Sequence, residues 1–328
     1  NRATQAERQP GSAMKPFVYL AAIQSGKTPG SIVEDSPVSF GSWSPKNYEN
    51  DYEGSMTYRY ALQHSRNVAA VKIADEVGMT KVIKLAKEMG ISTLTDQDYN
   101  LSTALGGLTH GVTPLEMVQA YGVLANGGIK VQPTAILKIV DRNGQVVEEN
   151  SIQEKRVVDE KDAAIITNML ESVINGGTGG NAAIGRPAAG KTGTTDDSKD
   201  AWFVGYTPDL VAAVWIGDDY GSETLRGITG GDTPAIMWGQ FMANALANTP
   251  ASDFSVPASA QSAVSEGYYN PVKAQPKKEA AKDEKADKKD DKDKSKDEAV
   301  KDDSGSKDDA TEQKSNSSKS KKSSKKDR

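Results

Sequence analysis

The chain has 328 residues and no cysteine, which excludes disulfides, thiolate metal sites and a cysteine nucleophile. Its formal net charge of −5 is unevenly spread, because residues 273–328 hold 19 basic and 15 acidic residues and almost no large apolar side chain. Such a segment cannot bury enough surface to offset chain entropy. We therefore predict a folded body over residues 1–250, a linker over 251–272 and a disordered tail over 273–328.

The first predicted element is a helix beginning at residue 12, after Pro10-Gly11. Apolar residues recur at helical spacing as far as Ala21, so Ser12 should stand at the N-terminus of a helix that buries one apolar stripe. The helix dipole would stabilise negative charge on its oxygen. Residues 27–57 are rich in Gly, Pro, Ser, Asn and Tyr and predict a long irregular segment. A helical pattern follows, breaks at 65–67 and resumes.

Helices and strands then alternate along the chain. Helices are predicted over 80–90, 113–127, 159–176 and 236–246, and strands in a hairpin at 135–147 and at 188–195, 201–207 and 210–217. Thr113 and Glu116 have the spacing of a capping box. Residues 211–216 are apolar on both faces, which is typical of a strand between two layers.

Three short motifs stand in a fixed order, Ser12-Ala-Met-Lys15, Ser65-Arg-Asn67 and Lys191-Thr-Gly-Thr194. A serine hydroxyl is a poor nucleophile until a base takes its proton. A lysine three residues later on the same helix face can be that base if its surroundings keep it neutral. S-x-x-K also occurs by chance in the polar tail, so only the order and spacing of all three motifs make the interpretation specific.

Together the motifs resemble the active-site triplet of penicillin-binding proteins and serine β-lactamases. The runs that begin at His64 and Asp200, HSRNVAA and DAWFVGY, further resemble the transpeptidase domain of class A penicillin-binding proteins over roughly residues 1 to 250. The resemblance implies an α+β fold with an antiparallel sheet flanked by helices and an all-helical region. We expect the first two of its five strands to be lacking here, leaving residues 211–216 as an unpaired apolar edge and the isolated chain prone to aggregate.

The resemblance implies acyl transfer, in which a stem peptide ending in D-Ala-D-Ala acylates the serine and an amine of a neighbouring stem resolves the acyl-enzyme. β-Lactams would stop at the acyl stage. We expect Ser12 to be the nucleophile and Lys15 the base that takes its proton. Ser65 is expected to relay the proton, and Asn67 to hold Lys15 and the substrate amide. Lys191, Thr192 and Thr194 would bind the substrate carboxylate, and Gly193 would keep the strand edge clear. The oxyanion hole is expected from the backbone N–H groups of Ser12 and Thr194.

No cofactor or metal is expected, since His64 and His110 lack ligand-like partners at a recognisable spacing. Ala13 departs from the threonine of many family members, and we hypothesise slower β-lactam acylation as a result. A class A β-lactamase would need a further glutamate. Glu171 begins an E-x-x-x-N match, but it is only about 20 residues before Lys191, and we interpret it as a surface helix residue. A D,D-carboxypeptidase and a non-catalytic β-lactam sensor or binding module remain open as alternatives.

The resembled family has a membrane anchor and a glycosyltransferase domain upstream, and neither is expected in this chain. We therefore expect contact with the membrane only through a missing N-terminal anchor. The resemblance also places the protein at the extracytoplasmic face of a bacterium, which we expect to be Gram-positive. Residues 314–328 carry seven basic groups against Asp327 alone. A solvated spacer is one interpretation, and binding to an anionic wall polymer is our hypothesis, with no nucleic acid expected as a partner.

Overall fold

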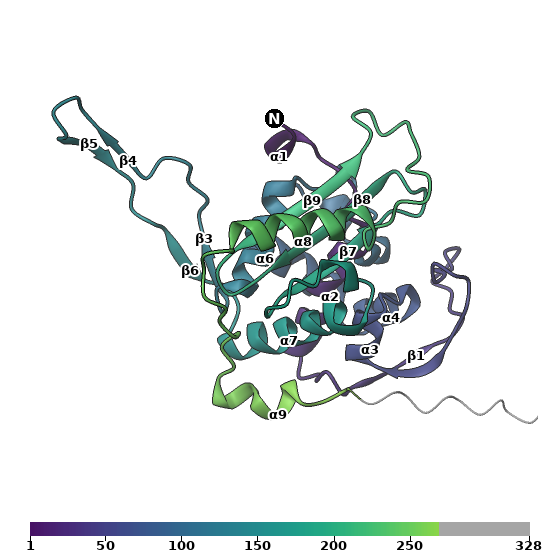
Figure 1. Ribbon diagram of the computed structural model, residues 1–328. Coiled ribbons are helices and arrows are strands. Elements are labelled where there is room, and N and C mark those ends of the chain that lie inside the picture. Colours follow the sequence, from purple (N-terminus) through teal and green to yellow (C-terminus); the bar gives the residue numbers. More distant parts are fainter. Residues whose placement is uncertain (269–328) are drawn as a thin grey trace, which may run out of the picture. The chain divides into compact units, whose positions relative to one another are not determined.

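A three-stranded antiparallel sheet lies at the centre of the computed structural model, which describes residues 1–268 (Figure 1). In the order in which they pair, its strands are β7 (Ala189–Thr194), β8 (Asp200–Tyr206) and β9 (Val211–Gly217). Each begins and ends within one residue of the predicted bounds. In the described part of the chain β9 pairs with β8 alone, so the predicted unpaired edge is present.

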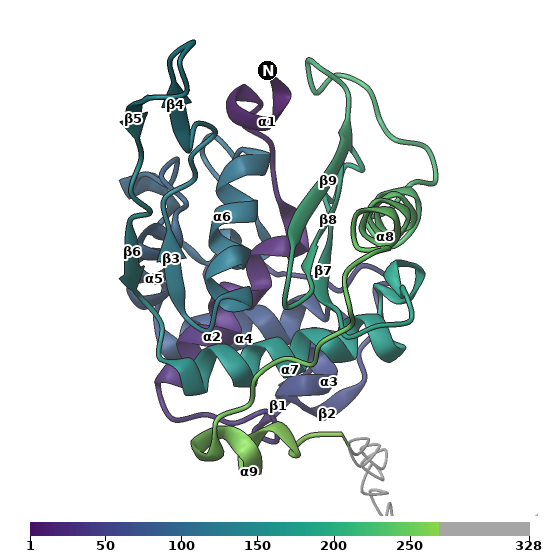
Figure 2. The ribbon, with the colours of Figure 1, turned by 60° about the vertical axis from the view of Figure 1, so that its left-hand side comes forward.

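Helices cover both faces of this sheet. One face of β8 and β9 packs against α6 (Pro114–Ala125) and the other against α8 (Thr233–Ala245), as Figure 2 shows. This arrangement confirms that residues 211–216 lie between two layers. The start of α6 also agrees with prediction, since Thr113 caps the helix and the Glu116 carboxylate accepts a hydrogen bond from the Thr113 backbone N–H at 2.9 Å.

The helix after the first motif, α2 (Lys15–Gln24), is buried on all sides. It packs against α4 (Asn67–Val77), α5 (Met79–Met89) and α7 (Glu160–Gly176). The predicted burial of its apolar stripe is confirmed, and the burial extends to its other faces. With helices on several sides, every residue from Lys15 to Ile23 is removed from water, including the charged side chain at its start.

A short hairpin interrupts the segment that was predicted to be irregular. Its strands, β1 (Ile32–Asp35) and β2 (Gly54–Thr57), pair antiparallel with Val33 opposite Met56, and both of these side chains are buried. Four residues per strand give too little alternation for the sequence pattern to detect. The hairpin leads into α3 (Tyr58–Gln63), which ends just before the second motif.

The predicted hairpin around Asn143-Gly144 is present and stands away from the body in Figure 1. Its outer strands are β4 (Lys138–Val140) and β5 (Val146–Glu149), and its base is formed by β3 (Ile129–Val131) and β6 (Glu154–Arg156). Two short helices complete the fold, α1 (Arg2–Gln5) and α9 (Gln261–Val264). Of the helices described, none has the length and apolar character needed to cross a membrane.

Residues 254–268 pack on the body, although we predicted a linker over 251–272. Arg59 is fully buried and donates hydrogen bonds to the backbone carbonyls of Val264 and Glu266, at 2.9 and 2.8 Å. A buried guanidinium requires such acceptors, because an unpaired charge away from water is costly. No local pattern predicts this pairing, because its partners are about 200 residues apart. The predicted disordered tail, 273–328, lies outside the described residues.

Candidate active site

The first motif occupies a tight turn between the sheet and α2. Ser12 lies in a 3₁₀ turn, Gly11–Met14, and the φ angle of Gly11 is 53°. A Cβ atom on Gly11 would lie 2.5 Å from the carbonyl oxygen of Thr194, and one on Gly106 would lie 2.3 Å from the carbonyl oxygen of Gly11. Only glycine allows backbones to approach this closely. The end of β7 and Gly106 therefore fix the position of Ser12 from two sides.

Lys15 lies beneath the turn and is 0% exposed. Its side-chain nitrogen Nζ donates to the Asn67 side-chain oxygen Oδ1 at 2.6 Å and also to the backbone carbonyl of Ser65. A third contact, at 3.1 Å, joins Lys15 Nζ to Ser65 Oγ. The first two motifs are thus in direct contact through Lys15. The Lys15 backbone N–H donates to the Ser12 carbonyl. Within the described residues, no hydrogen bond joins the Ser12 hydroxyl to Lys15 Nζ.

The third motif reaches the same hydroxyl from the other side. Lys191 is also 0% exposed, and its Nζ donates to Ser65 Oγ at 2.8 Å and to Thr192 Oγ1 at 3.2 Å. Thr192 Oγ1 is in turn 2.8 Å from Thr178 Oγ1. A continuous chain of hydrogen bonds therefore runs from Thr178 through Lys191 and Ser65 to Lys15.

Burial lowers the pKa of both lysines. Loss of water, followed by the nearby positive charge of Lys191, lowers the pKa of Lys15 well below its ordinary value. Burial alone lowers the pKa of Lys191 to about 7. The lowered pKa of Lys15 favours its neutral amine, which is the state that a general base requires.

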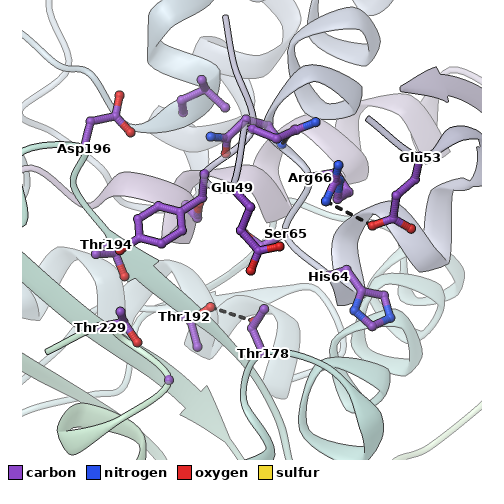
Figure 3. A pocket seen from close by; sticks show the side chains of 16 residues that line it. Glu49, Glu53, His64, Ser65, Arg66, Thr178, Thr192, Thr194, Asp196 and Thr229 are labelled. Carbon is purple, nitrogen blue, oxygen red and sulfur yellow. Dashed lines mark hydrogen bonds and ion pairs between the residues drawn. The ribbon is translucent and has the colours of Figure 1, made fainter. Parts of the chain in front are cut away.

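A cavity of about 330 Å³ borders Ser65, the residue that both lysines contact (Figure 3). Of the residues predicted from the motifs, the cavity is lined by Ser12, Ser65, Asn67, Thr192 and Thr194. The buried Lys15 and Lys191 contact this lining from below through Ser65. The structure thus gathers the three motifs, which are separated by up to about 180 residues of sequence, around one space.

Gly193 and Ala13 face each other where β7 crosses the turn that contains Ser12. A Cβ atom on Gly193 would lie 2.3 Å from the backbone oxygen of Pro10 and 3.2 Å from the Ala13 Cβ. The glycine is therefore required by contact with the turn before Ser12. Ala13 is fully buried, so its methyl group does not border the cavity.

Several residues of the cavity wall were not predicted as site residues. Glu49 and Asp196 reach the cavity from different elements (Figure 3), and Tyr48 and Thr178 also line it. Tyr48 lies in the segment 27–57, which the sequence predicts only to be irregular. Short polar side chains in a loop carry no periodicity, so the sequence offered no signal for the others.

Glu171 lies on α7 and is absent from the cavity lining. It is half-buried rather than a surface residue, and burial raises the pKa of its carboxyl. Its carboxylate accepts a hydrogen bond from the Asn168 amide at 3.1 Å. The carboxylate is thus occupied within its own helix, which agrees with rejecting the β-lactamase match.

A family model described as the penicillin binding protein transpeptidase domain matches residues 1–225. The chain belongs to this family. A relative named penicillin-binding protein 1A from Aquifex aeolicus (strain VF5) is 40% identical over 264 residues, which cover 78% of this chain and 36% of the relative. The protein of the same name from Neisseria gonorrhoeae is 39% identical over 285 residues, covering 82% and 35%. The chain thus spans about a third of the length of these relatives.

Solved structures of penicillin-binding proteins share the fold. Penicillin-binding protein 1A from Haemophilus influenzae has a TM-score of 0.74 and 30% identity, over 79% of this chain and 45% of its own. The PonA1 protein from Mycobacterium tuberculosis, solved in complex with penicillin V, has a TM-score of 0.69 and 30% identity, over 76% and 72%. The expectation of a Gram-positive source is not supported, because the relatives include proteins of Gram-negative bacteria.

For this transpeptidase domain, Lys191 predicts a pH dependence of ligand binding. Below its pKa of about 7 the side chain is an ammonium that attracts a carboxylate, and above that pH it is neutral. The dissociation constant for the non-covalent penicillin complex, obtained from acylation rates at several penicillin concentrations, should rise between pH 6 and pH 8.5. In Lys191→Met this dissociation constant should be large at both pH values. Equal constants for the unchanged protein at the two pH values would show that Lys191 does not supply the charge.

Proposed function

We propose that this domain is a serine D,D-transpeptidase that cross-links peptidoglycan stem peptides ending in D-Ala-D-Ala. The observation that carries the proposal is the pair of buried lysines joined through Ser65 Oγ, directly beneath the turn that presents Ser12. A neutral amine below a serine is suited to activating the hydroxyl. The named complex of the similar PonA1 protein with penicillin V supports the same chemistry.

In the proposed reaction Lys15 takes the proton of the Ser12 hydroxyl as Oγ attacks the carbonyl carbon of the penultimate D-Ala. The resulting oxyanion would be bound by the backbone N–H groups of Ser12 and Thr194, and each such donor typically contributes about 3 kcal/mol. Ser65 passes the proton from Lys15 to the nitrogen of the last D-Ala, which leaves as a free amino acid. An ester between Ser12 and the peptide remains.

The second half of the reaction repeats these steps in reverse. An amine of a neighbouring stem attacks the ester, its proton returns through Lys15, and the Ser12 hydroxyl leaves with a new peptide bond formed. Asn67 holds the Lys15 amine and the substrate amide, while Lys191, Thr192 and Thr194 bind the terminal carboxylate. Water in place of the amine would make the domain a D,D-carboxypeptidase.

Covalent labelling tests the proposal. The described domain should form an adduct with a fluorescent penicillin, visible as a mass increase of the intact protein, and Ser12→Ala should form none. An adduct stable for hours would exclude a β-lactamase, which releases its acyl group. Product analysis with a D-Ala-D-Ala peptide, with and without an added acceptor amine, would then separate transpeptidase, carboxypeptidase and non-catalytic sensor. Labelling that persists in Ser12→Ala would overturn the assignment of the nucleophile.

We further propose that the complete protein acts at the extracytoplasmic face of the cell membrane. The relatives are nearly three times as long as their matched part, which leaves room for a membrane anchor and a glycosyltransferase domain. The basic end, residues 314–328, lies outside the described residues, and its binding to an anionic wall polymer stays a hypothesis. Removal of these fifteen residues should reduce retention of the protein on isolated cell walls. Unchanged retention would reject the hypothesis.

A further inference from the structure

Asn47 is a buried residue of the cavity wall that makes four hydrogen bonds to three different parts of the domain. It is 4% exposed. Its side-chain oxygen Oδ1 accepts from the backbone N–H groups of Asn67 and Val68, at 2.9 and 3.1 Å. Its amide nitrogen Nδ2 donates to the Asp35 carboxylate at 2.8 Å and to the backbone carbonyl of Asp51 at 2.7 Å. Every hydrogen-bonding position of the primary amide is therefore used.

The first two of these bonds complete the start of α4, the helix that carries Asn67. The residue before the helix, Arg66, makes no capping bond with its own side chain within residues 1–268. Asn47 supplies the missing acceptor from 20 residues away in the sequence. The backbone carbonyl of the preceding residue, Lys46, accepts from Asn67 Nδ2 at 2.9 Å. That contact leaves Asn67 Oδ1 directed to Lys15, with which it pairs at 2.6 Å.

Asp35 anchors this arrangement from below. Its carboxylate is fully buried and accepts from Asn47, from the Glu53 backbone N–H at 3.1 Å, and from Arg66 Nη2 and Nε at 2.8 and 3.0 Å. A buried carboxylate with this many donors is held tightly in one position. The position of Asn47 therefore follows from β1, an element that has no residue in the cavity lining.

We propose that Asn47 is a positioning residue for acyl transfer, acting through Asn67 on Lys15. The inference rests on the proposed function. By fixing the Asn67 amide, Asn47 keeps Lys15 Nζ in line with Ser65 and keeps water away from it. Tyr48 and Glu49 directly follow Asn47 and line the cavity, so the segment that contacts a ligand is also the segment that holds the base.

The decisive experiment compares Asn47→Ala and Asn47→Asp with the double variant Asp35→Asn/Asn47→Asp. Asn47→Ala removes both sets of bonds. Asn47→Asp keeps the acceptor for α4 but places two carboxylates side by side, and the double variant restores one amide and one carboxylate. Thr113→Ala is the control, because it removes the cap of α6, away from the cavity. Two quantities are measured, the rate of penicillin acylation against pH and the pKa of Lys15 from carbon NMR of labelled lysine.

Both Asn47 variants should acylate about 10- to 100-fold more slowly at pH 7, as expected for a displaced catalytic group. Water admitted to Lys15, or the added negative charge, should raise its pKa, so that acylation requires a higher pH than in the unchanged protein. The double variant should recover most of the rate and of the pH profile, and Thr113→Ala should alter neither. If Asn47→Ala leaves the pH profile and the pKa of Lys15 as they are in Thr113→Ala, Asn47 is only a helix cap and the inference is wrong.

Failure of the proposed function gives a different result. In that case the unchanged protein would form no penicillin adduct at Ser12. The NMR titration needs no reaction, and it would still decide whether Asn47 controls the pKa of Lys15.

Discussion

Lys15→Met should slow acylation by penicillin strongly and make the protein more stable at pH 6. General base catalysis typically contributes 10²- to 10⁴-fold, so we expect the acylation rate to fall by about 10³. Stability should change in the opposite direction, because burial is the main cause of the low pKa of Lys15. At pH 6 the Lys15 side chain is protonated in the unfolded chain, and folding removes it from water. Methionine avoids this cost at similar volume, and we expect a gain of roughly 1 to 3 kcal/mol.

The sign of the pH dependence provides the check. Between the lowered pKa of folded Lys15 and the value of about 10.4 in the unfolded chain, the unfolded state binds more protons. The free energy of unfolding of the unchanged protein should therefore rise with pH in this window, and the advantage of Lys15→Met should shrink. Urea unfolding at pH 6, 8 and 9.5 measures the free energy of unfolding of the unchanged protein and of Lys15→Met. Lys84→Met, at a side chain 74% exposed, is the control and should show no such trend. A variant that is less stable than the parent at pH 6 would contradict the argument.

Gly106→Ala should damage the site through backbone contact alone. The φ angle of Gly106 is 82°, and an added Cβ would lie 2.3, 2.4 and 2.6 Å from the O, N and Cα atoms of Gly11. The left-handed conformation costs about 1 kcal/mol for alanine. Displacing the backbone of Gly11 adds to this cost, so we expect the free energy of unfolding to fall by roughly 3 kcal/mol or more. Since Gly11 precedes Ser12, acylation should slow by about 100-fold.

Gly185→Ala separates these two causes. Gly185 also has a positive φ, 71°, but a Cβ atom there would meet nothing within 4 Å. The free energy of unfolding of Gly185→Ala should fall only by the conformational cost, and the variant should acylate at the rate of the parent. Penicillin acylation and urea unfolding of both variants, measured side by side, would test the contact. Similar acylation rates for Gly106→Ala and Gly185→Ala would mean that the turn containing Ser12 tolerates displacement.

The sequence allowed the site to be predicted where a motif is local. Ser12 and Lys15 are close in sequence, and the four residues of Lys191-Thr-Gly-Thr194 are consecutive, so each of these motifs can be found without knowledge of the fold. The capping box at Thr113 is equally local. The resemblance joined these pieces, because no property of one motif reveals its contact with another.

The parts that escaped prediction depend on partners far apart along the chain. Asp35, Asn47 and Arg66 form one network across about 30 residues, and none of them has a distinctive pattern alone. Arg59 similarly binds carbonyl groups of residues 264–266. A polar side chain that is buried looks like a surface side chain in the sequence, because hydropathy does not show which acceptor it will meet.

The hydroxyl of Ser65 has one hydrogen atom, and this limits how charge can be distributed in the floor of the site. Lys15 Nζ donates to Asn67, to the Ser65 carbonyl and to the Ser65 hydroxyl oxygen. The Ser65 oxygen can still accept from Lys191. An anion arriving beside Lys191 favours its ammonium form, and that positive charge lowers the pKa of Lys15. In the proposed reaction, a substrate carboxylate bound at Lys191 would thus couple ligand recognition to the protonation state of Lys15.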